Sequence, residues 1–222
     1  MQRYINPSLE QWKVLTQRGA ASYSSLEPLA KEVFDNVAQY GDQALKTYTE
    51  KFDKVKLEGF SVDVKEIELA KNRVPEKLKL AIQKAKENIY LFHKAQITEE
   101  VKVEIQTGVK CWQKKLPIEK VGLYIPGGSA PLFSTILMLA IPAQVAGCDR
   151  IVLCSPPDSK GQLSDVILYT ANLCGIDTIF KVGGMQAIAG MTLGTETIPK
   201  VDKLFGPGNQ YVTVAKQLAT QY

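Results

Sequence analysis

The chain changes its hydrophobic pattern near residue 115 of 222. Before this point, apolar residues recur at the three- and four-residue spacing of amphipathic helices. One such run extends from Leu26 to Val37 and is closed by Gly41, and Asp42 is a suitable N-cap for a second helix. A third stripe runs from Leu78 to Phe92, and Pro75 suits its first turn. The first part of the chain is therefore predicted to be mostly helical.

A β-hairpin is predicted to join the two parts of the chain. The stretch from Val101 to Ile105 alternates apolar and charged residues, and so does the stretch that begins at Val109. Thr107-Gly108 lies between them and supplies a turn. Residues 54–64 have a mixed composition and are expected to form a loop. We expect one domain over residues 1–115 and a second over residues 116–222.

Residues 116–222 alternate short apolar runs with amphipathic stretches and are predicted to form a βα domain. Glycines at 147, 175 and 194 stand where helices are expected to stop. Short links between alternating strands and helices imply right-handed crossovers and a parallel sheet that is covered on both faces. The predicted strands span 121–125, 150–154, 178–182 and 201–205, and the predicted helices span about 132–146, 162–174, 185–193 and 209–220.

The loops that follow these strands carry the clearest indication of a ligand site. Their sequences are IPGGSA, CSPPD, VGGMQ and FGPGN, and three of them hold paired or nearly paired glycines. Parallel sheets bind ligands beyond the carboxyl ends of their strands, where glycine lets a ligand approach the backbone amides at a helix start. Each loop could instead be a tight turn. The G-x-G-x-x-G pattern is absent. No acidic residue closes the second strand, where a partner for a ribose would be expected, because Asp158 lies beyond its end. An anionic or nucleotide-like ligand would therefore bind in an atypical way.

Three side chains in these loops are candidate ligand contacts. Tyr124 precedes the Pro-Gly-Gly turn, and its ring could stack on a base or pack in the core. Gln186 directly follows two glycines at a helix start, where its carboxamide can donate and accept. Asn209 follows Gly-Pro-Gly and could serve as a helix N-cap or as a ligand contact.

Histidine and cysteine usage limits the chemistry of the chain. His93 is the one histidine, so a catalytic metal site with two imidazoles cannot be built from one copy. It stands at the margin of a predicted helix, where it could be packed or take a catalytic role. The four cysteines, at 111, 148, 154 and 174, contain no C-x-x-C pair and are expected to be buried, reduced thiols of a cytoplasmic protein.

Charge and hydropathy argue against nucleic-acid and membrane partners. The net charge is +4, but the lysines are spread along the helical stretches. This distribution is typical of a solvated surface and lacks the basic patch of a nucleic-acid binder. The longest apolar run, near residues 136–145, contains Pro142 and Gln144 and is too short to span a bilayer.

Two long segments of this sequence resemble histidinol dehydrogenase. They are VGLYIPGGSAPLFSTILMLAIPAQVAG and VGGMQAIAGMTLGTETIPKVDKLFGPGN, and the upstream segments YGDQALKTYTEKFD and ENIYLFHKAQ fit the family too. The resemblance implies oxidation of L-histidinol to L-histidine through L-histidinal, in two NAD-dependent steps that end histidine biosynthesis. It also implies a zinc-dependent homodimer and an α/β fold, with a helical N-terminal region followed by an incomplete Rossmann-like parallel-sheet domain.

The resemblance assigns NAD contacts to this chain but no catalytic residue and no metal ligand. Tyr124, Gln186 and Asn209 match the family positions that contact NAD. The family's Gln-Ala-Glu-His run, its zinc ligands and its Glu-His base pair are expected beyond Tyr222, so the chain is expected to be truncated and inactive alone. The alternatives are a non-catalytic nucleotide- or phosphate-binding module, a regulatory remnant that pairs with a full-length subunit, and a fragment that only self-associates.

Overall fold

A four-stranded parallel sheet forms the centre of the molecule, in a computed structural model that describes residues 3–16, 24–127 and 131–222. The strand order is β5-β4-β3-β6, so the sequence-adjacent strands β3, β4 and β5 run outward in one direction and β6 pairs on the other side of β3. The strands are β3 (Lys120–Tyr124), β4 (Arg150–Ser155), β5 (Thr178–Lys181) and β6 (Lys203–Phe205). The prediction of a parallel α/β sheet is confirmed.

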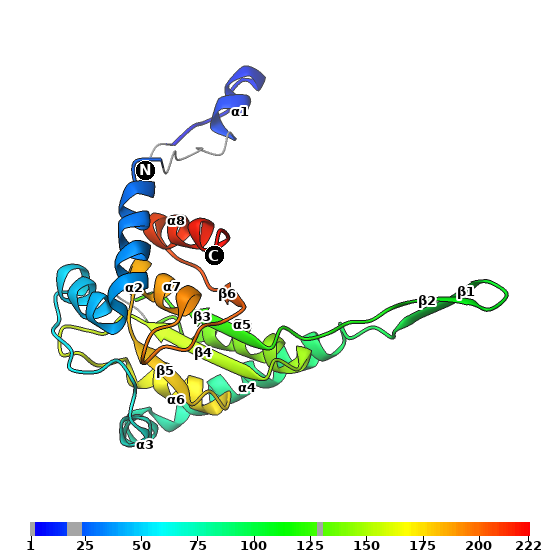
Figure 1. Cartoon of the computed structure of the whole chain (residues 1–222). Coiled ribbons are helices and arrows are strands. Elements are labelled where there is room, and N and C mark those ends of the chain that lie inside the picture. The colour runs from blue at the N-terminus through cyan, green and yellow to red at the C-terminus, as the bar shows by residue number, and fades with distance from the viewer. Residues whose placement is uncertain (1–2, 17–23, 128–130) are drawn as a thin grey trace.

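Helices cover both faces of this sheet (Figure 1). The helices α5 and α6 lie on one face, and α7 and α8 lie on the other, because the chain changes direction between β5 and β6. Their bounds are α5 (Phe133–Ala146), α6 (Asp165–Leu173), α7 (Gly184–Leu193) and α8 (Gln210–Ala219). The change of face creates a crevice at the carboxyl edge of the sheet, which is where open α/β sheets bind ligands.

The helices of the N-terminal region pack on the outside of these layers. The helix α2 (Glu27–Tyr48) packs against α7 and α8, α3 (Val64–Arg73) against α6, and α4 (Glu76–Lys94) against α5. The helix α3 was not predicted from the sequence, although Asp63 and Glu66 form a capping box at its start. The division of the chain at residue 115 stays a prediction.

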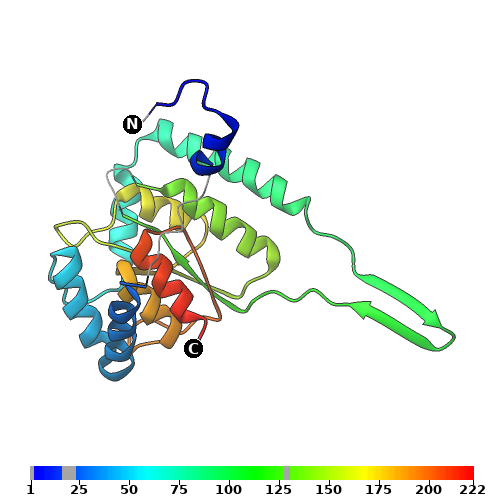
Figure 2. The ribbon, with the colours of Figure 1, turned by 90° about the horizontal axis from the view of Figure 1, so that it is seen from above.

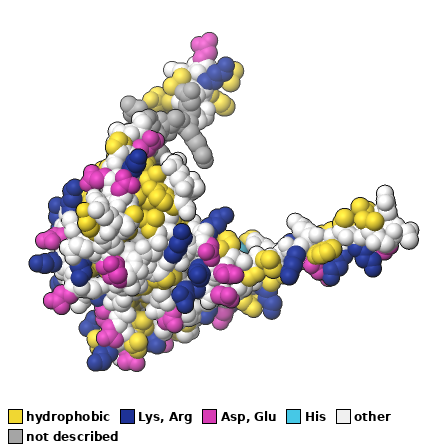
Figure 3. All heavy atoms as spheres, viewed as in Figure 1, with side chains coloured by type: hydrophobic (Ala, Val, Ile, Leu, Met, Phe, Trp, Pro, Cys, Tyr) yellow, Lys and Arg dark blue, Asp and Glu magenta, His cyan; other side chains and the backbone are white. Residues whose placement is uncertain are grey.

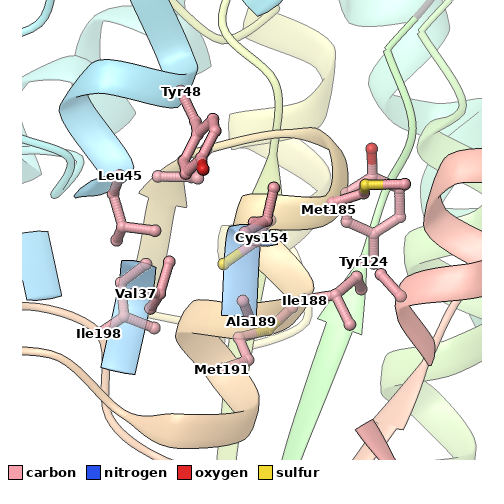
Figure 4. Close-up of a cluster of buried hydrophobic side chains, with 14 of the residues drawn as sticks. Val37, Leu45, Tyr48, Tyr124, Cys154, Met185, Ile188, Ala189, Met191 and Ile198 are labelled. Atoms are coloured by element: carbon pink, nitrogen blue, oxygen red, sulfur yellow. The ribbon is translucent and has the colours of Figure 1, made fainter. Parts of the chain in front are cut away.

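Two hydrophobic cores lie on opposite faces of the sheet. Successive residues of a strand point to opposite faces, so Leu123 belongs to the core under α3, α4, α5 and α6, while Tyr124 belongs to the core under α2, α7 and α8. Figure 4 shows part of the second core, with Tyr124 on one side of the cluster and Leu45 on the other. This alternation places the Tyr124 ring between the sheet and α7.

Gly41 breaks α2 as predicted, but Asp42 does not cap the following segment. Gly41 has φ 49° and ψ −127°, which separates two helical segments. The Asp42 amide donates to the Glu196 carboxylate at 2.8 Å, and the Asp42 carboxylate accepts from the hydroxyl of Thr197. A long-range contact therefore replaces the local cap, because the loop after α7 supplies both partners. The second segment passes into a π-helix, Thr49–Asp53.

The predicted hairpin projects from the body as a two-stranded arm (Figure 2). Its strands, β1 (Val101–Gln106) and β2 (Val109–Gln113), are exposed at every position. The helix α1 (Leu9–Leu15) likewise buries no residue. In Figure 3 basic and acidic side chains are interspersed over the visible face of the body, and apolar side chains lie along the arm. No helix within the described residues is both long and apolar enough for a bilayer crossing.

Candidate functional site

A cleft of about 780 Å³ opens at the carboxyl edge of the sheet. It has the size and the position of small-molecule sites in parallel α/β proteins. Its lining comes from the loops after all four strands and from the π-helix, and it includes Phe52, Asp53, Tyr124, Pro126, Gly127, Ser155, Pro156, Gly184, Gln186, Asn209 and Tyr211. All three predicted contact residues therefore line one cleft.

Tyr124 is both a core aromatic and a lining residue, so the two alternatives for its role are compatible. Its side chain is only 4% exposed, and its hydroxyl oxygen accepts a hydrogen bond from the Gly184 amide at 3.1 Å. Burial raises the pKa of Tyr124 to about 12, which keeps the hydroxyl protonated at neutral pH. The Tyr124 hydroxyl donates no hydrogen bond to a described residue, which leaves it able to donate to a ligand.

Gln186 is fully buried at the first turn of α7. Its Nε2 donates to Oδ2 of Asp53 at 3.1 Å. Its Oε1 has no hydrogen-bond partner in the described part of the chain, and a buried unpaired acceptor is unfavourable. The side chain thus presents one satisfied and one unsatisfied polar atom next to the cleft.

Asn209 is exposed and takes the N-cap position of α8. Its Oδ1 accepts from the Val212 amide at 3.1 Å, which confirms the capping interpretation. The carboxamide nitrogen makes no hydrogen bond within residues 3–16, 24–127 and 131–222, and Asn209 lines the cleft. Capping therefore fixes the orientation of the side chain and leaves its donor group free.

Two glycines at the cleft have positive φ, and at one of them two loops approach each other too closely for a larger residue. Gly206 has φ 138°, and a Cβ there would lie 2.1 Å from the carbonyl oxygen of Tyr124. Gly184 has φ 60°, and a Cβ there would lie 2.7 Å from Oε1 of Gln186. The close approach to backbone requires glycine at Gly206, whereas at Gly184 glycine is favoured by the positive φ, because the neighbouring Gln186 side chain can move. Gly128 to Ala130 of the first loop lie outside the described residues.

Asp53 lines the cleft although no sequence pattern indicated it. It ends the π-helix, is half-buried, and is followed by Lys54 in the left-handed conformation, with φ 60°. Burial raises the pKa of Asp53 to about 6. Its partner Gln186 is separated from it by 133 residues, so only the folded chain brings the pair together. Asp158, in contrast, uses its carboxylate to close its own loop through the amides of Lys160 and Gln162.

The described residues do not provide a metal site. No group of three or more histidine, cysteine, aspartate or glutamate side chains gathers within them. His93 lies at the margin of α4, where Nδ1 is 3.1 Å from Oε1 of Gln96, and it does not line the cleft. Cys154 and Cys174 are buried, but Cys111 lies exposed on the hairpin, so the expectation that all the thiols are buried was wrong.

The fold and the cleft define an α/β protein with a small-molecule site at the carboxyl edge of a parallel sheet. The sequence profile of the histidinol dehydrogenase family matches residues 16–222, and the chain belongs to this family. The predicted family membership is thereby confirmed. The family has a biosynthetic role and the activity of an oxidoreductase.

Curated relatives and a solved structure agree with this assignment. Histidinol dehydrogenase of Bacteroides thetaiotaomicron is 53% identical over 214 residues, which cover 96% of this chain and 50% of the relative. The enzyme of Escherichia coli K12 is 51% identical and is covered to 48%. The crystal structure of histidinol dehydrogenase from Elizabethkingia anophelis matches the whole chain with a TM-score of 0.94 at 53% identity, over 51% of its own length. The chain spans about half the length of the curated relatives that it matches.

Proposed function

We propose that the cleft binds NAD and that the chain supplies the cofactor site of a cytoplasmic enzyme that oxidises L-histidinol to L-histidine through L-histidinal. One observation supports this proposal most strongly. The cleft at the carboxyl edge of the sheet is lined by Tyr124, Gln186 and Asn209, which by resemblance match the family's NAD-contacting positions. Bound NAD would accept the hydride that leaves the substrate carbon. Family membership supports the reaction, and the cleft supports the location of the cofactor.

The residues of the cleft fit a dinucleotide in their hydrogen-bonding chemistry. Tyr124 offers a protonated hydroxyl, Gln186 offers an unpaired carbonyl oxygen, and the carboxamide nitrogen of Asn209 offers a donor. The Gly184 amide donates to the Tyr124 hydroxyl. The next amides in the first turn of α7 have no side-chain cap and can contact an anionic group such as a pyrophosphate. These groups would bind and orient the cofactor.

The described residues do not fit a zinc site, so the proposal assigns them no part in zinc binding or proton transfer. The relatives are about twice as long as this chain. We place the zinc ligands, the acid and base groups and most L-histidinol contacts in the part of the family's length that this chain does not cover. A homodimer is part of the same proposal. The chain alone is then expected to bind NAD without oxidising L-histidinol.

Titration calorimetry of the chain with NAD tests the cofactor site. We expect Gln186→Ala and Asn209→Asp each to weaken NAD binding about 10-fold, which is the effect of one hydrogen bond to a ligand. The substitution Asn209→Asp keeps the acceptor that caps α8 and removes only the donor. Gln83→Ala and Asn88→Ala, at exposed positions of α4, are the matched controls and should bind NAD as the unmodified chain does.

The same titration separates NAD binding from the alternative of a general phosphate-binding module. Inorganic phosphate and AMP are titrated beside NAD at equal ionic strength. A clear preference for NAD that is lost in Gln186→Ala supports the cofactor site. Equal binding of all three compounds, or no binding of NAD, would contradict it.

A further inference from the structure

Asp53 reaches the cleft from a part of the chain that lies outside the βα units. The carboxylate comes from the last residue of a five-residue π-helix, and single-turn π-helices are frequent at functional sites. Oδ1 of Asp53 also lies near the start of α7, because a Cβ at Gly183 would be 3.3 Å from it. The side chain therefore faces the first turn of α7, where Gln186 stands.

The hydrogen bond to Asp53 is the one polar contact of the Gln186 side chain with the described residues. Gln186 has no exposed surface in the unliganded cleft, so Asp53 is the described partner that orients its carboxamide. An ionised carboxylate can only accept, so it selects the –NH₂ group of the carboxamide and turns the carbonyl oxygen away. The charge of Asp53 thus holds the –NH₂ group of Gln186 and leaves its carbonyl oxygen without a partner.

The carbonyl oxygen that is turned away lies beside Gly184, as does the Tyr124 hydroxyl. Oε1 of Gln186 would be 2.7 Å from a Cβ at Gly184, and the Gly184 amide donates to the Tyr124 hydroxyl. A free acceptor and a free donor therefore flank the same glycine at the cleft. A planar group that carries an N–H donor next to an acceptor would satisfy both, and carboxamides and aminopyrimidine edges have this arrangement.

We propose that Asp53 is a positioning residue, whose ionised carboxylate holds Gln186 so that Oε1 accepts an N–H donor from the bound ligand. This inference rests on the proposed NAD site, since NAD carries both a carboxamide, on the nicotinamide, and an aminopyrimidine edge, on the adenine. Asp53 itself acts through Gln186. Replacement of Asp53 should therefore weaken NAD binding only when Gln186 is present.

A double-mutant cycle on NAD binding tests this dependence. Calorimetric titrations compare the unmodified chain with Asp53→Ala, Gln186→Ala and the double variant. We expect Asp53→Ala to weaken binding about 10-fold, as for a lost hydrogen bond to a charged group, and to have no further effect in the Gln186→Ala background. Equal weakening by Asp53→Ala in both backgrounds would overturn the positioning role.

Two further variants separate positioning from damage to the fold. Asp53→Asn keeps the shape of the side chain but can donate as well as accept, so the carboxamide of Gln186 is no longer oriented and binding should weaken about as much as in Asp53→Ala. Glu50→Gln removes an exposed carboxylate from the same π-helix and should leave NAD binding unchanged. Circular dichroism and thermal unfolding verify that each variant is folded. Full NAD affinity in folded Asp53→Asn would contradict the proposal.

Two NAD analogues identify the donor that Gln186 accepts. One carries a carboxylate in place of the nicotinamide carboxamide, and the other carries unsubstituted purine in place of adenine, so each lacks one of the two N–H donors. We expect one analogue to bind the unmodified chain about 10-fold more weakly than NAD, and this difference to disappear in Gln186→Ala. If both analogues bind the unmodified chain as NAD does, Oε1 accepts no N–H donor and the inference is wrong.

The outcomes distinguish the inference from the proposed function. If the unmodified chain binds NAD and the double-mutant cycle is additive, the cofactor site stands and the role of Asp53 fails. If the unmodified chain does not bind NAD, the proposed function fails, and the role of Asp53 fails with it.

Discussion

Replacement of Asp53 by asparagine is expected to stabilise the fold at neutral pH and not in acid. The carboxyl group is half-buried beside Gln186, and burial raises its pKa from 3.8 to about 6. Because the folded state disfavours the charge, the ionised carboxylate lowers the free energy of unfolding. Asparagine has nearly the same shape and carries no charge, so this unfavourable contribution disappears.

The size of the effect follows from the change in pKa. A rise from 3.8 to about 6 corresponds to about 3 kcal/mol at roughly 1.36 kcal/mol per pH unit. Partial exposure of the carboxyl group screens its charge, so the net effect is smaller. We expect Asp53→Asn to raise the free energy of unfolding by about 1–2 kcal/mol at pH 7.

The pH dependence of this difference has a definite sign. Well below pH 3.8 the carboxyl group is protonated in both the folded and the unfolded chain, so Asp53 does not lower the free energy of unfolding there. As the pH rises through about 6, the folded chain ionises as well and the stabilising contribution of the protonated group is lost. The stability advantage of Asp53→Asn should therefore be near zero well below pH 3.8, grow as the pH rises, and reach its full size at pH 7.

Urea denaturation at a series of pH values measures the difference directly. The unmodified chain, Asp53→Asn and the control Glu50→Gln are unfolded between about pH 4.5 and pH 8, and the two variants are compared with the unmodified chain at each pH. Glu50 is exposed, so its replacement should give a small difference that does not vary near pH 6. A difference for Asp53→Asn that is constant with pH, or that shrinks as the pH rises, would refute the reasoning.

Three other changes test the packing of the molecule. Gly206→Ala places a Cβ 2.1 Å from the carbonyl oxygen of Tyr124 at a φ of 138°, and should lower the free energy of unfolding by about 2–4 kcal/mol, whereas Gly59→Ala, with no atom within 4 Å, should leave it nearly unchanged in the same urea experiment. Leu153→Ala removes a fully buried side chain from the central strand β4 and should lower the free energy of unfolding by about 2–5 kcal/mol, so a loss below about 1 kcal/mol would contradict the packing described. Replacement of residues 100–114 by a short Gly-Ser linker should change the free energy of unfolding of the body by less than about 0.5 kcal/mol, because every position of the two strands is exposed; a large loss of stability would show that the arm packs on the body.

The sheet domain could be predicted well from the sequence because its signals are local. Each strand is a short apolar run, and glycines at 147, 175 and 194 adopt positive φ at or just after the ends of α5, α6 and α7. The predicted strands agree with the observed ones to within two residues at either end. The placement of the ligand loops at one edge followed from the parallel topology alone, and it brought Tyr124, Gln186 and Asn209 to one cleft.

Features that depend on contacts between distant segments were not predictable in this way. The hydrogen bond from the Asp42 amide to Glu196 and the pairing of Asp53 with Gln186 join residues more than a hundred positions apart. Asp53 also stands in a π-helix, which has no hydrophobic period that a sequence pattern can reveal. The helix α3 had a recognisable capping box at Asp63, so its start was encoded locally although its apolar stripe is short.

The two expected effects of Asp53→Asn have opposite signs, and this combination identifies the role of the carboxylate. If Asp53 serves only the fold, its replacement should lower the free energy of unfolding of the chain, and NAD binding should weaken because the fold is damaged. A residue whose buried charge orients a ligand contact should give a more stable chain that binds NAD more weakly, because the charge is unfavourable to folding and favourable to the orientation of Gln186. Stability and affinity measured on the same Asp53→Asn sample at pH 7 therefore decide between the two roles. Parallel losses of both would place Asp53 in the structural framework, and a gain in stability with a loss of affinity would place it in the cofactor site.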